Sequence, residues 1–321
     1  MRIPDLLLTR RLWARIFAGA VLAGMTRRGS ADDRANAARL SWDSAPGPDD
    51  GQERRYRATA QILVFSLPLV RWPNVGGGSA VWRESVLPAD GALRFLEFTG
   101  FSRPEHAAGL NRLGFIREIS RVPGGESLYF GLMTASPEET AEEARKALNS
   151  TAKEAAYTAI DGRLTGGSVE TVVAHFTAPA NWSVSNRSDL IRLARTALAT
   201  TPGRPLEGGA PGNPVRPFLE TLADALRRPG SAEARFTYAG RFYRLTLEKT
   251  PDSKVTAAYR QRGLVPPGAQ VVRASGKLRR ETGGKESNFR LWVEEGAARP
   301  LPLRIEYQAR AFLRLIFETE A

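Results

Sequence analysis

Few residues of this 321-residue chain could perform nucleophilic or acid–base chemistry. The chain contains two histidines, His106 and His175, and no cysteine. A hydrolase with a nucleophile elbow needs Gly-x-Ser-x-Gly at a turn from a strand to a helix. That motif is absent, and Ser79, which follows glycines 76–78, opens a predicted strand instead. We therefore expect no catalytic residue, and a hydrolase is the weakest of three functional hypotheses.

The same residues predict neither a metal site nor a cofactor. Without cysteine, a zinc site would need histidine together with carboxylates. His106 stands beside Glu105 in a predicted turn and His175 lies in an apolar strand, patterns that are more typical of surface or core histidines. A phosphate loop requires Gly-Lys-Ser/Thr before a helix, whereas the Gly-Gly-Lys-Glu at 283–286 is interpreted as a hairpin turn. A catalytic triad formed from distant positions stays open, because proximity in space is invisible in a sequence.

Aromatic side chains are the remaining candidates for a binding site. In a half-open barrel, aromatic rings on the concave face could hold a lipid or another apolar small molecule. The competing interpretation is ordinary core packing of the sheet against its helices. The candidate ligand-binding residues, all on predicted strands, are Trp82, Tyr238, Phe242, Trp292 and Tyr307.

The formal charge of +12 is unevenly distributed. Residues 1–31 hold six Arg and one Asp, residues 32–230 hold 23 basic and 23 acidic side chains, and residues 231–321 hold 17 basic and 10 acidic ones. The C-terminal excess would favour anionic partners such as lipid head groups or acidic glycans, but a solvated, weakly basic sheet face is the favoured interpretation. Interleaved charges there are expected to form cross-strand pairs opposite the core, at Arg290, Glu294, Arg304, Glu306 and Arg314.

The elements that must position these residues are mostly strands. Alternation of apolar and polar residues predicts a strand with one buried face. Strands are predicted at 56–62, 65–72, 79–86, 93–101, 113–122, 127–133, 270–280, 287–293, 303–307 and 312–317, with a break at glycines 76–78 and hairpins at 157–176 and 234–247. Short strands with few crossover helices indicate a mainly β protein: an antiparallel meander forming a strongly curved sheet or open barrel, with a few short helices packed on it.

Three helices interrupt this pattern. A capping box at Ser136-Pro137-Glu138-Glu139 begins the first, a second covers 188–198, and a third covers 215–228 with apolar residues on one face. We expect one β-rich domain over 56–321 with helical insertions near 136–149 and 187–228. The alternative is a split into 56–200 and 212–321.

The N-terminus reads as a cleavable export signal. Four arginines precede an apolar stretch at 16–25, and small residues at 29–31 form a cleavage site before Asp32. The Arg10-Arg11 pair also fits a twin-arginine signal. The stretch is too short to span a bilayer, so we expect a periplasmic or secreted protein without a transmembrane anchor. Residues 32–55, which are polar and small, predict a flexible leader.

The C-terminal part resembles a bacterial family. Its features are a Leu-rich helix (218–226), a hairpin with a glycine turn (236–245), Val-Pro-Pro-Gly-Ala at 265–269, Phe-Arg-Leu-Trp-Val at 289–293 and Pro-Leu-Pro-Leu-Arg-Ile-Glu-Tyr at 300–307. Over residues 212–318 they resemble the uncharacterised family called domain of unknown function 3108. The resemblance implies export and a curved antiparallel sheet, and supplies neither an activity nor catalytic residues.

Together these features predict an exported, non-enzymatic protein, expected to be a monomer that binds an apolar or envelope-derived ligand in its curved sheet. The alternative is an envelope assembly or structural factor that binds a protein partner through its sheet edge or its basic C-terminal face. Nucleic acid is excluded as a partner, because export removes the target.

Overall fold

The computed structural model describes residues 40–64, 67–87, 91–107, 111–134, 153–166, 168–205, 215–283, 286–310 and 313–320. The predicted signal peptide (1–31) and the predicted helix at 136–149 lie outside these residues. The described strands are β1 (Gly51–Val64), β2 (Leu67–Leu87), β3 (Gly91–Ser102), β4 (Leu113–Val122), β5 (Ser127–Thr134), β6 (Glu154–Thr165), β7 (Ser168–Pro179), β8 (Arg204–Pro205), β9 (Arg216–Pro217), β10 (Ala232–Tyr238), β11 (Arg241–Pro251), β12 (Val271–Arg280), β13 (Ser287–Glu294), β14 (Arg304–Arg310) and β15 (Leu313–Thr319). The described helices are α3 (Arg187–Ala199), α4 (Phe218–Arg227) and α5 (Ser253–Gln261), with short 3-10 turns η1 (Trp42–Ser44), η2 (Pro48–Asp50) and η3 (Val184–Asn186).

All the described strands belong to one 15-stranded sheet, whose order is β8-β7-β6-β5-β4-β3-β2-β1-β15-β14-β13-β12-β11-β10-β9. Neighbours pair antiparallel, apart from the parallel pair β9–β10. The two halves of the chain meet where β1 pairs with β15, from Tyr56 opposite Thr319 to Ile62 opposite Leu313. The sheet is strongly curved and unclosed, as predicted, and it carries few short helices.

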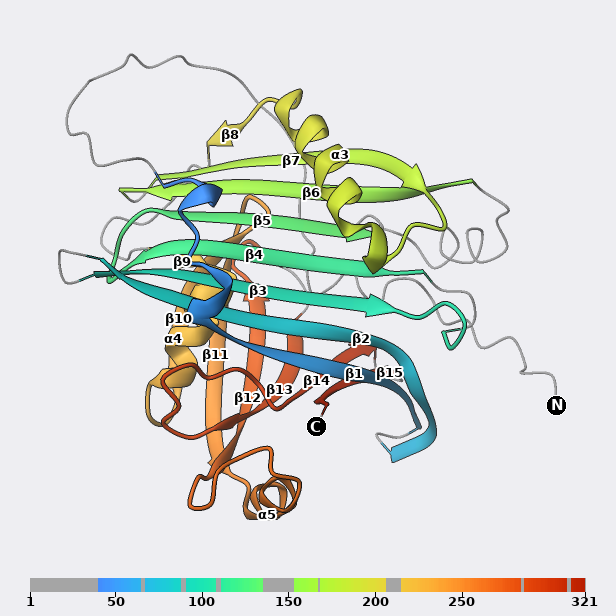
Figure 1. The fold of residues 1–321 in the computed structure, drawn as a ribbon, viewed down its shortest axis with the longest axis vertical. Helices are drawn as coiled ribbons and strands as arrows, with labels where there is room; N and C mark the ends of the chain where they lie inside the picture. The colour runs from blue at the N-terminus through green and yellow to red at the C-terminus, as the bar shows by residue number, and fades with distance from the viewer. Residues whose placement is uncertain are drawn as a thin grey trace.

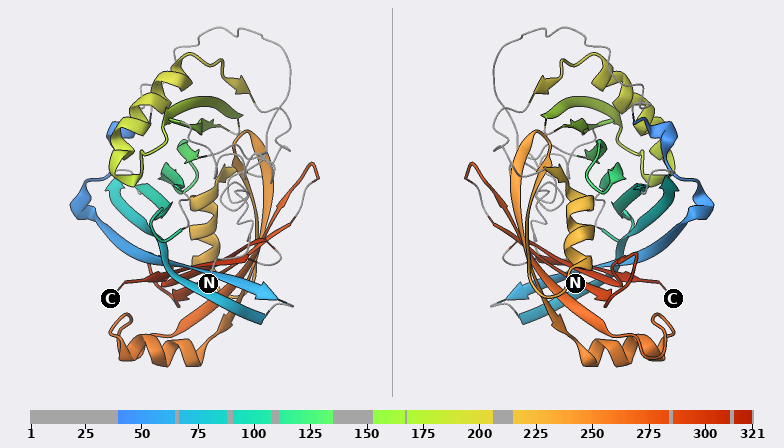
Figure 2. Two further views of the ribbon diagram at one scale, coloured as in Figure 1. Left: turned by 90° about the vertical axis from the view of Figure 1, so that its right-hand side faces the viewer. Right: turned by 90° about the vertical axis from the view of Figure 1, so that its left-hand side faces the viewer.

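The curvature brings the two halves of the sheet face to face. Strands β3 to β7 cross over β10 to β14, and α4 lies between them (Figures 1 and 2). Both halves contribute to one buried cluster, in which the rings of Tyr129 on β5 and Tyr238 on β10 lie 6.2 Å apart. Leu219 and Ala223 of α4 pack against a second cluster around β1, β2 and β15. The interior of the curved sheet is therefore filled by α4 and by large side chains.

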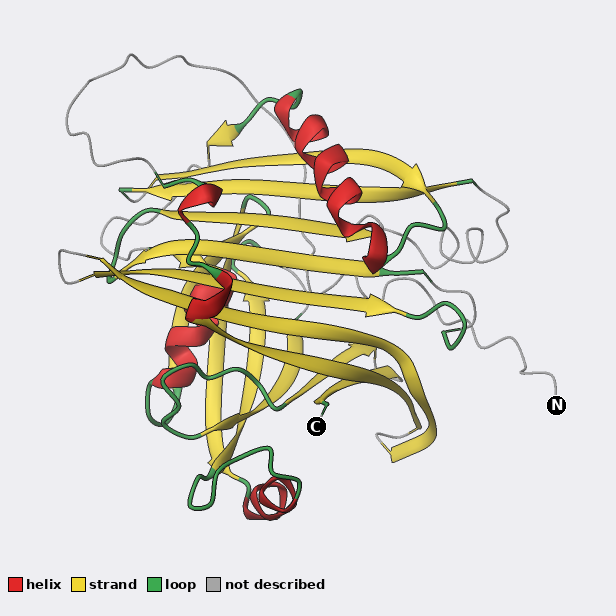
Figure 3. Cartoon of the chain, viewed as in Figure 1, coloured by secondary structure: helices red, strands yellow, loops and turns green. Residues whose placement is uncertain are grey.

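Helix α3 covers the outer face of β6 and β7 (Figure 3). Its Leu190 and Ala194 are fully buried against Phe115, Leu132 and Tyr157. We expect Leu190→Ala to lower the free energy of unfolding by about 2–5 kcal/mol, because a cavity replaces the side chain. Denaturant unfolding followed by circular dichroism measures this.

The control is Arg192→Ala on the same helix, because the Arg192 side chain is 72% exposed. A loss equal to that of Leu190→Ala would mean that the loss does not report the buried contact, since alanine is the better helix former in both exchanges.

Glycines 76–78 do not break the strand, contrary to the sequence-based prediction. They lie within β2, which pairs with β1 and β3 on its two sides. A Cβ atom on Gly76 would lie 2.1 Å from the Phe101 carbonyl oxygen, and one on Gly78 would lie 2.6 Å from that of Thr99. These glycines therefore allow the strands to approach closely. The glycine cluster marks a close contact, not a turn.

The described part of the predicted leader (32–55) is ordered, so that prediction also needs correction. Leu40 is fully buried. Its amide donates to Glu126 Oε2 at 2.8 Å, and its carbonyl accepts from Arg163 Nη2 at 3.1 Å. Strand β1 then begins at Gly51, before the predicted start at Tyr56. A single leucine in a polar segment gives no periodic signal that would predict this anchoring.

Helix α5 was missed by the sequence analysis. Its cap is Asp252, whose Oδ1 accepts from the Val255 amide at 3.1 Å. The Asp252 Oδ2 also accepts from Trp292 Nε1 at 2.9 Å, which joins the start of the helix to β13. Aspartate followed by a helix-compatible run is a recognisable N-cap signal, and it was the available clue.

Candidate functional site

The five aromatic residues predicted to bind a ligand do not line one common cavity. Trp82 and Tyr307 belong to one buried cluster on the inner face of the sheet. Tyr238 belongs to the neighbouring cluster between the two sheet halves. Trp292 packs on the outer face with Tyr259 of α5.

The fifth of these residues, Phe242, lies at the β10–β11 hairpin, with the Arg235 guanidinium 4.1 Å from its ring centre. Four of the five side chains are nearly inaccessible, with Trp82 at 1% exposure and Trp292 at 6%. Their role as ligand contacts stays a prediction, and the structure places them as packing residues.

Among the described residues, a pocket of about 560 Å³ lies at the ends of the strands, where β2 is followed by β3 and β4 is followed by β5. We call it the end pocket. Its volume is in the range of small-molecule sites. It is lined by Glu84, Val86, Gly91, Ala92, Arg94, Val122, Pro123, Arg216 and Asp224.

The strand register builds the end pocket in rows. The row nearest the strand ends is apolar. It consists of three residues that lie directly opposite one another on β2, β3 and β4: Val86, Ala92 and Val122. Side chains two residues apart on a strand share a face, so the next row holds Glu84, Arg94 and Ser120. Val86 is 89% exposed, an unusual position for a large apolar side chain. The pocket therefore has an apolar rim above a charged floor.

The floor is an ion network between the sheet and α4. Arg94, which is 5% exposed, donates to Asp224 Oδ1 on α4 at 3.0 Å and lies 3.5 Å from Glu84 Oε1. Arg216 pairs with Asp224 and lies 3.5 Å from Glu220 Oε1. Because the cations and carboxylates of the lining balance, the floor presents polar groups without a strong net charge.

One of the five aromatic residues, Trp82, lies against this network. Its Nε1 donates to Glu84 Oε2 at 3.0 Å. The guanidinium carbons of Arg94 and Arg227 lie 5.1 and 4.5 Å from its ring centre, at the distance of cation–π contacts. Trp82 therefore contacts two residues of the pocket floor, Glu84 and Arg94, and does not line the pocket itself.

The third row, two residues farther along the strands from the pocket opening, contains the buried carboxyl group of Glu118 on β4. Its two oxygens accept from the Leu219 and Glu220 amides at 2.8 Å each, at the start of α4. Burial raises the pKa of Glu118 to about 8, against the opposing effect of these hydrogen bonds. Burial also raises the pKa of Glu220, whose Oε2 accepts from Ser127 Oγ at 3.2 Å. The start of α4 is thus held by a carboxyl group that is largely protonated at neutral pH.

The two histidines lie apart from these groups. His175 is exposed on β7, and its Nδ1 lies 3.1 Å from Thr158 Oγ1. His106 is exposed in a turn after β3. Within the described ranges, no group of three or more histidines or carboxylates is arranged to hold a metal ion. No described helix is long and apolar enough to cross a membrane.

The charged residues of the end pocket were not singled out from the sequence, although a signal was present. Arg94 shares its strand face with Leu96 and Phe98, and Glu118 shares its face with Ile116. Charged residues in phase with the core face of a strand are costly to bury. The position of Arg94 and Glu118 on the core-facing side of their strands could therefore have predicted a buried ion network or a functional site.

Comparison with known proteins gives a structural likeness at low sequence identity. No family model matches the chain, and none of the curated proteins matches its sequence. Among solved structures, the chain is similar to a crystal structure described as a beta-barrel-like protein of domain of unknown function DUF1849 from Brucella abortus. The TM-score is 0.40 at 9% sequence identity, over 84% of this chain and 95% of that one.

Proposed function

We propose that this protein is an exported, non-enzymatic binding protein that takes one amphipathic, envelope-derived molecule in the end pocket. The observation that carries the proposal is the apolar row of Val86, which is exposed, and of Ala92 and Val122, which are half-buried, above a charge-balanced polar floor. An apolar chain would contact the row, and a polar head group without strong net charge would meet Arg94 and Asp224.

The N-terminal signal supports export, since a basic segment, an apolar stretch and a small-residue cleavage pattern stand in the required order. The resemblance of residues 212–318 to the family called domain of unknown function 3108 also supports export; it supplies no activity, and it stays a proposal.

Native mass spectrometry of the mature protein, purified from the periplasm of its own cells, tests this function. We expect one co-purifying small molecule per chain, identified by lipid extraction. In Ala92→Phe the added ring occupies the pocket, so the molecule should be lost while the melting temperature stays within a few degrees of the parent. Ala258→Phe, which places the same ring on the exposed face of α5, is the matched control and should keep the molecule.

An empty protein in the parent and both variants would contradict the proposal, and so would retention of the molecule in Ala92→Phe. Alanine in place of Trp82 would be a poorer test, because that residue is 1% exposed and its loss would disturb packing and not contact with a ligand.

A second candidate function is the binding of a protein partner along the sheet edge. Strand β7 pairs with β8 only at Glu170 and Thr171. Among the described strands, residues 172–179 of β7 therefore have no partner on that side. Exposed strand edges can accept an added strand from another protein. The same native mass spectra separate the candidates, because a protein partner adds far more mass than a small molecule.

A further inference from the structure

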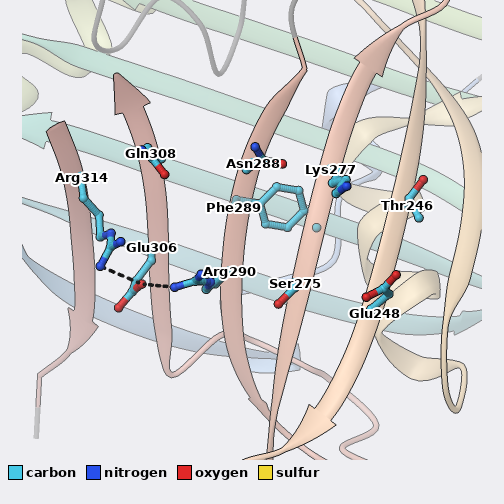
Figure 4. A pocket seen from close by; sticks show the side chains of 11 residues that line it. Thr246, Glu248, Ser275, Lys277, Asn288, Phe289, Arg290, Glu306, Gln308 and Arg314 are labelled. Atoms are coloured by element: carbon cyan, nitrogen blue, oxygen red, sulfur yellow. Dashed lines mark ion pairs between the residues drawn. The ribbon is translucent and has the colours of Figure 1, made fainter. Parts of the chain in front are cut away.

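A second pocket lies on the opposite, outer face of the sheet, away from the end pocket. It is a groove of about 280 Å³ that crosses β11 to β15, and we call it the outer groove (Figure 4). It is lined by Thr246, Glu248, Ser275, Gly276, Lys277, Asn288, Phe289, Arg290, Glu306, Gln308 and Arg314. The polar members alternate along their strands with the core residues of the inner face, so they point outward.

One end of the outer groove concentrates positive charge around a single carboxylate. Glu306 is 7% exposed and lies in contact with Arg304. Arg290 Nη1 and Arg314 Nη1 approach the Glu306 Oε2 to 3.7 and 4.0 Å. These are the expected cross-strand pairs, but both distances exceed that of a hydrogen bond.

The three guanidinium groups therefore carry more positive charge than Glu306 neutralises. Within the described part of the chain, Arg290 and Arg314 have this shared oxygen as their ion-pair partner. Each guanidinium has five N–H donors in a planar fork that matches a carboxylate. A ligand carboxylate at this end of the groove would receive donors that Glu306 leaves unused.

The rest of the groove is lined by side chains suited to hydroxyl groups. Asn288 and Gln308 offer both amide donors and amide acceptors, and Ser275 and Thr246 offer hydroxyls. Glu248 lies at the opposite end from Arg314 (Figure 4). Its carboxylate accepts from hydroxyl donors and repels a second anionic group. The groove thus combines one cationic end with a remainder of neutral side chains, Glu248 and Lys277, whose ammonium group lies 3.7 Å from Glu286 Oε1.

We propose that the outer groove binds an acidic saccharide, with the sugar carboxylate on Arg290 and Arg314 and the ring hydroxyls on Asn288, Gln308 and Glu248. A plain anion would use the cationic end alone and would be repelled by Glu248. A neutral sugar would leave the cationic end unpaired. A saccharide with one carboxylate and several hydroxyls satisfies both ends. The groove lies on another face from the end pocket, so this inference does not depend on the function proposed above.

Isothermal titration of the mature protein with glucuronate tests the inference, with glucose and inorganic phosphate as comparison ligands. We expect glucuronate to bind and the other two to bind more weakly. In Arg290→Gln/Arg314→Gln, glucuronate affinity should fall by about 10-fold to 100-fold, because two charge-assisted hydrogen bonds are lost. In Glu248→Gln, phosphate should gain affinity relative to glucuronate, because the repulsion at the far end is removed.

Arg244→Gln is the matched control, because it removes the same charge from β11 at a surface ion pair with Glu233. Its affinity should equal that of the parent. The side chain of Arg290 is 50% exposed, so the double variant is expected to fold, and its circular dichroism spectrum checks this. Absence of glucuronate binding by the parent, equal binding of phosphate, or unchanged affinity in the folded double variant would each overturn the proposal.

Discussion

Replacing Arg94 with methionine is expected to lower the free energy of unfolding by about 3–5 kcal/mol, the cost of breaking a buried ion pair from one side. Arg94 is 5% exposed and joins the sheet to α4 through Asp224 at 3.0 Å. Methionine retains much of the aliphatic volume but not the guanidinium that lies over Trp82, so the loss reports the ion pair together with the cation–π contact. Urea unfolding at neutral pH, followed by tryptophan fluorescence, measures the difference.

A double-mutant cycle with Asp224→Asn isolates the contact. If Arg94 acts through Asp224, the double variant should lose about 0.5–3 kcal/mol less than the sum of the single variants. Additive losses would show that the two side chains act independently. The cycle is informative because Asp224 also pairs with Arg216, which keeps the aspartate partly compensated when Arg94 is absent.

The sequence predicted the class of fold because most strands bury one face and expose the other. Alternation around the Ala239-Gly240 turn located the β10–β11 hairpin, where both residues adopt positive φ angles of 49° and 71°. The apolar stripe of α4 located that helix, since one of its faces meets the core. Each of these signals is local, and each lies within about a dozen residues.

The remaining features depend on contacts between distant residues. The pairing of β1 with β15 joins the two ends of the described chain, and no local pattern encodes it. The same limit explains the aromatic residues. Trp82 and Trp292 both alternate correctly along their strands, but one faces inward and the other lies under α5. The alternation along a strand predicts which side chains share a face, and only the pairing of all the strands determines which face forms a pocket.

The end pocket shows where this limit affects function. Val86, Ala92 and Val122 are unremarkable apolar residues in three separate strands. They become a binding surface only because the strand register aligns them at one end of the sheet. Arg94 and Glu118 were readable as core-facing charges, but their common partner, α4, follows more than 95 residues later along the chain. The alternation along a strand is thus enough to predict that a charged side chain is buried, but it does not predict which distant element that side chain contacts.

The carboxyl group at the start of α4 should make stability depend on pH. The pKa of Glu118 is about 8 in the folded protein against a usual 4.5, with burial as the main cause. Between these values the folded state binds one more proton than the unfolded state. The contribution of Glu118 to the free energy of unfolding should therefore be largest below about pH 4.5 and fall as pH rises to about 8, by up to about 1.4 kcal/mol per pH unit. Glu220, whose pKa burial also raises, acts in the same direction.

Glu118→Gln is expected to flatten this dependence. Glutamine stays neutral at every pH, but its carbonyl oxygen accepts from only one of the two α4 amides, because its NH2 group is a donor. At pH 5 it should therefore be less stable than the parent, by about 1–3 kcal/mol for the amide left without an acceptor, and this deficit should shrink as pH rises to 8. Urea unfolding at pH 5, 6, 7 and 8 gives both curves. Glu233→Gln, at a largely exposed position, should follow the parent throughout. Parallel curves for Glu118→Gln and the parent would mean that Glu118 is ionised in the folded protein, and that the two amide hydrogen bonds and the helix terminus outweigh its burial.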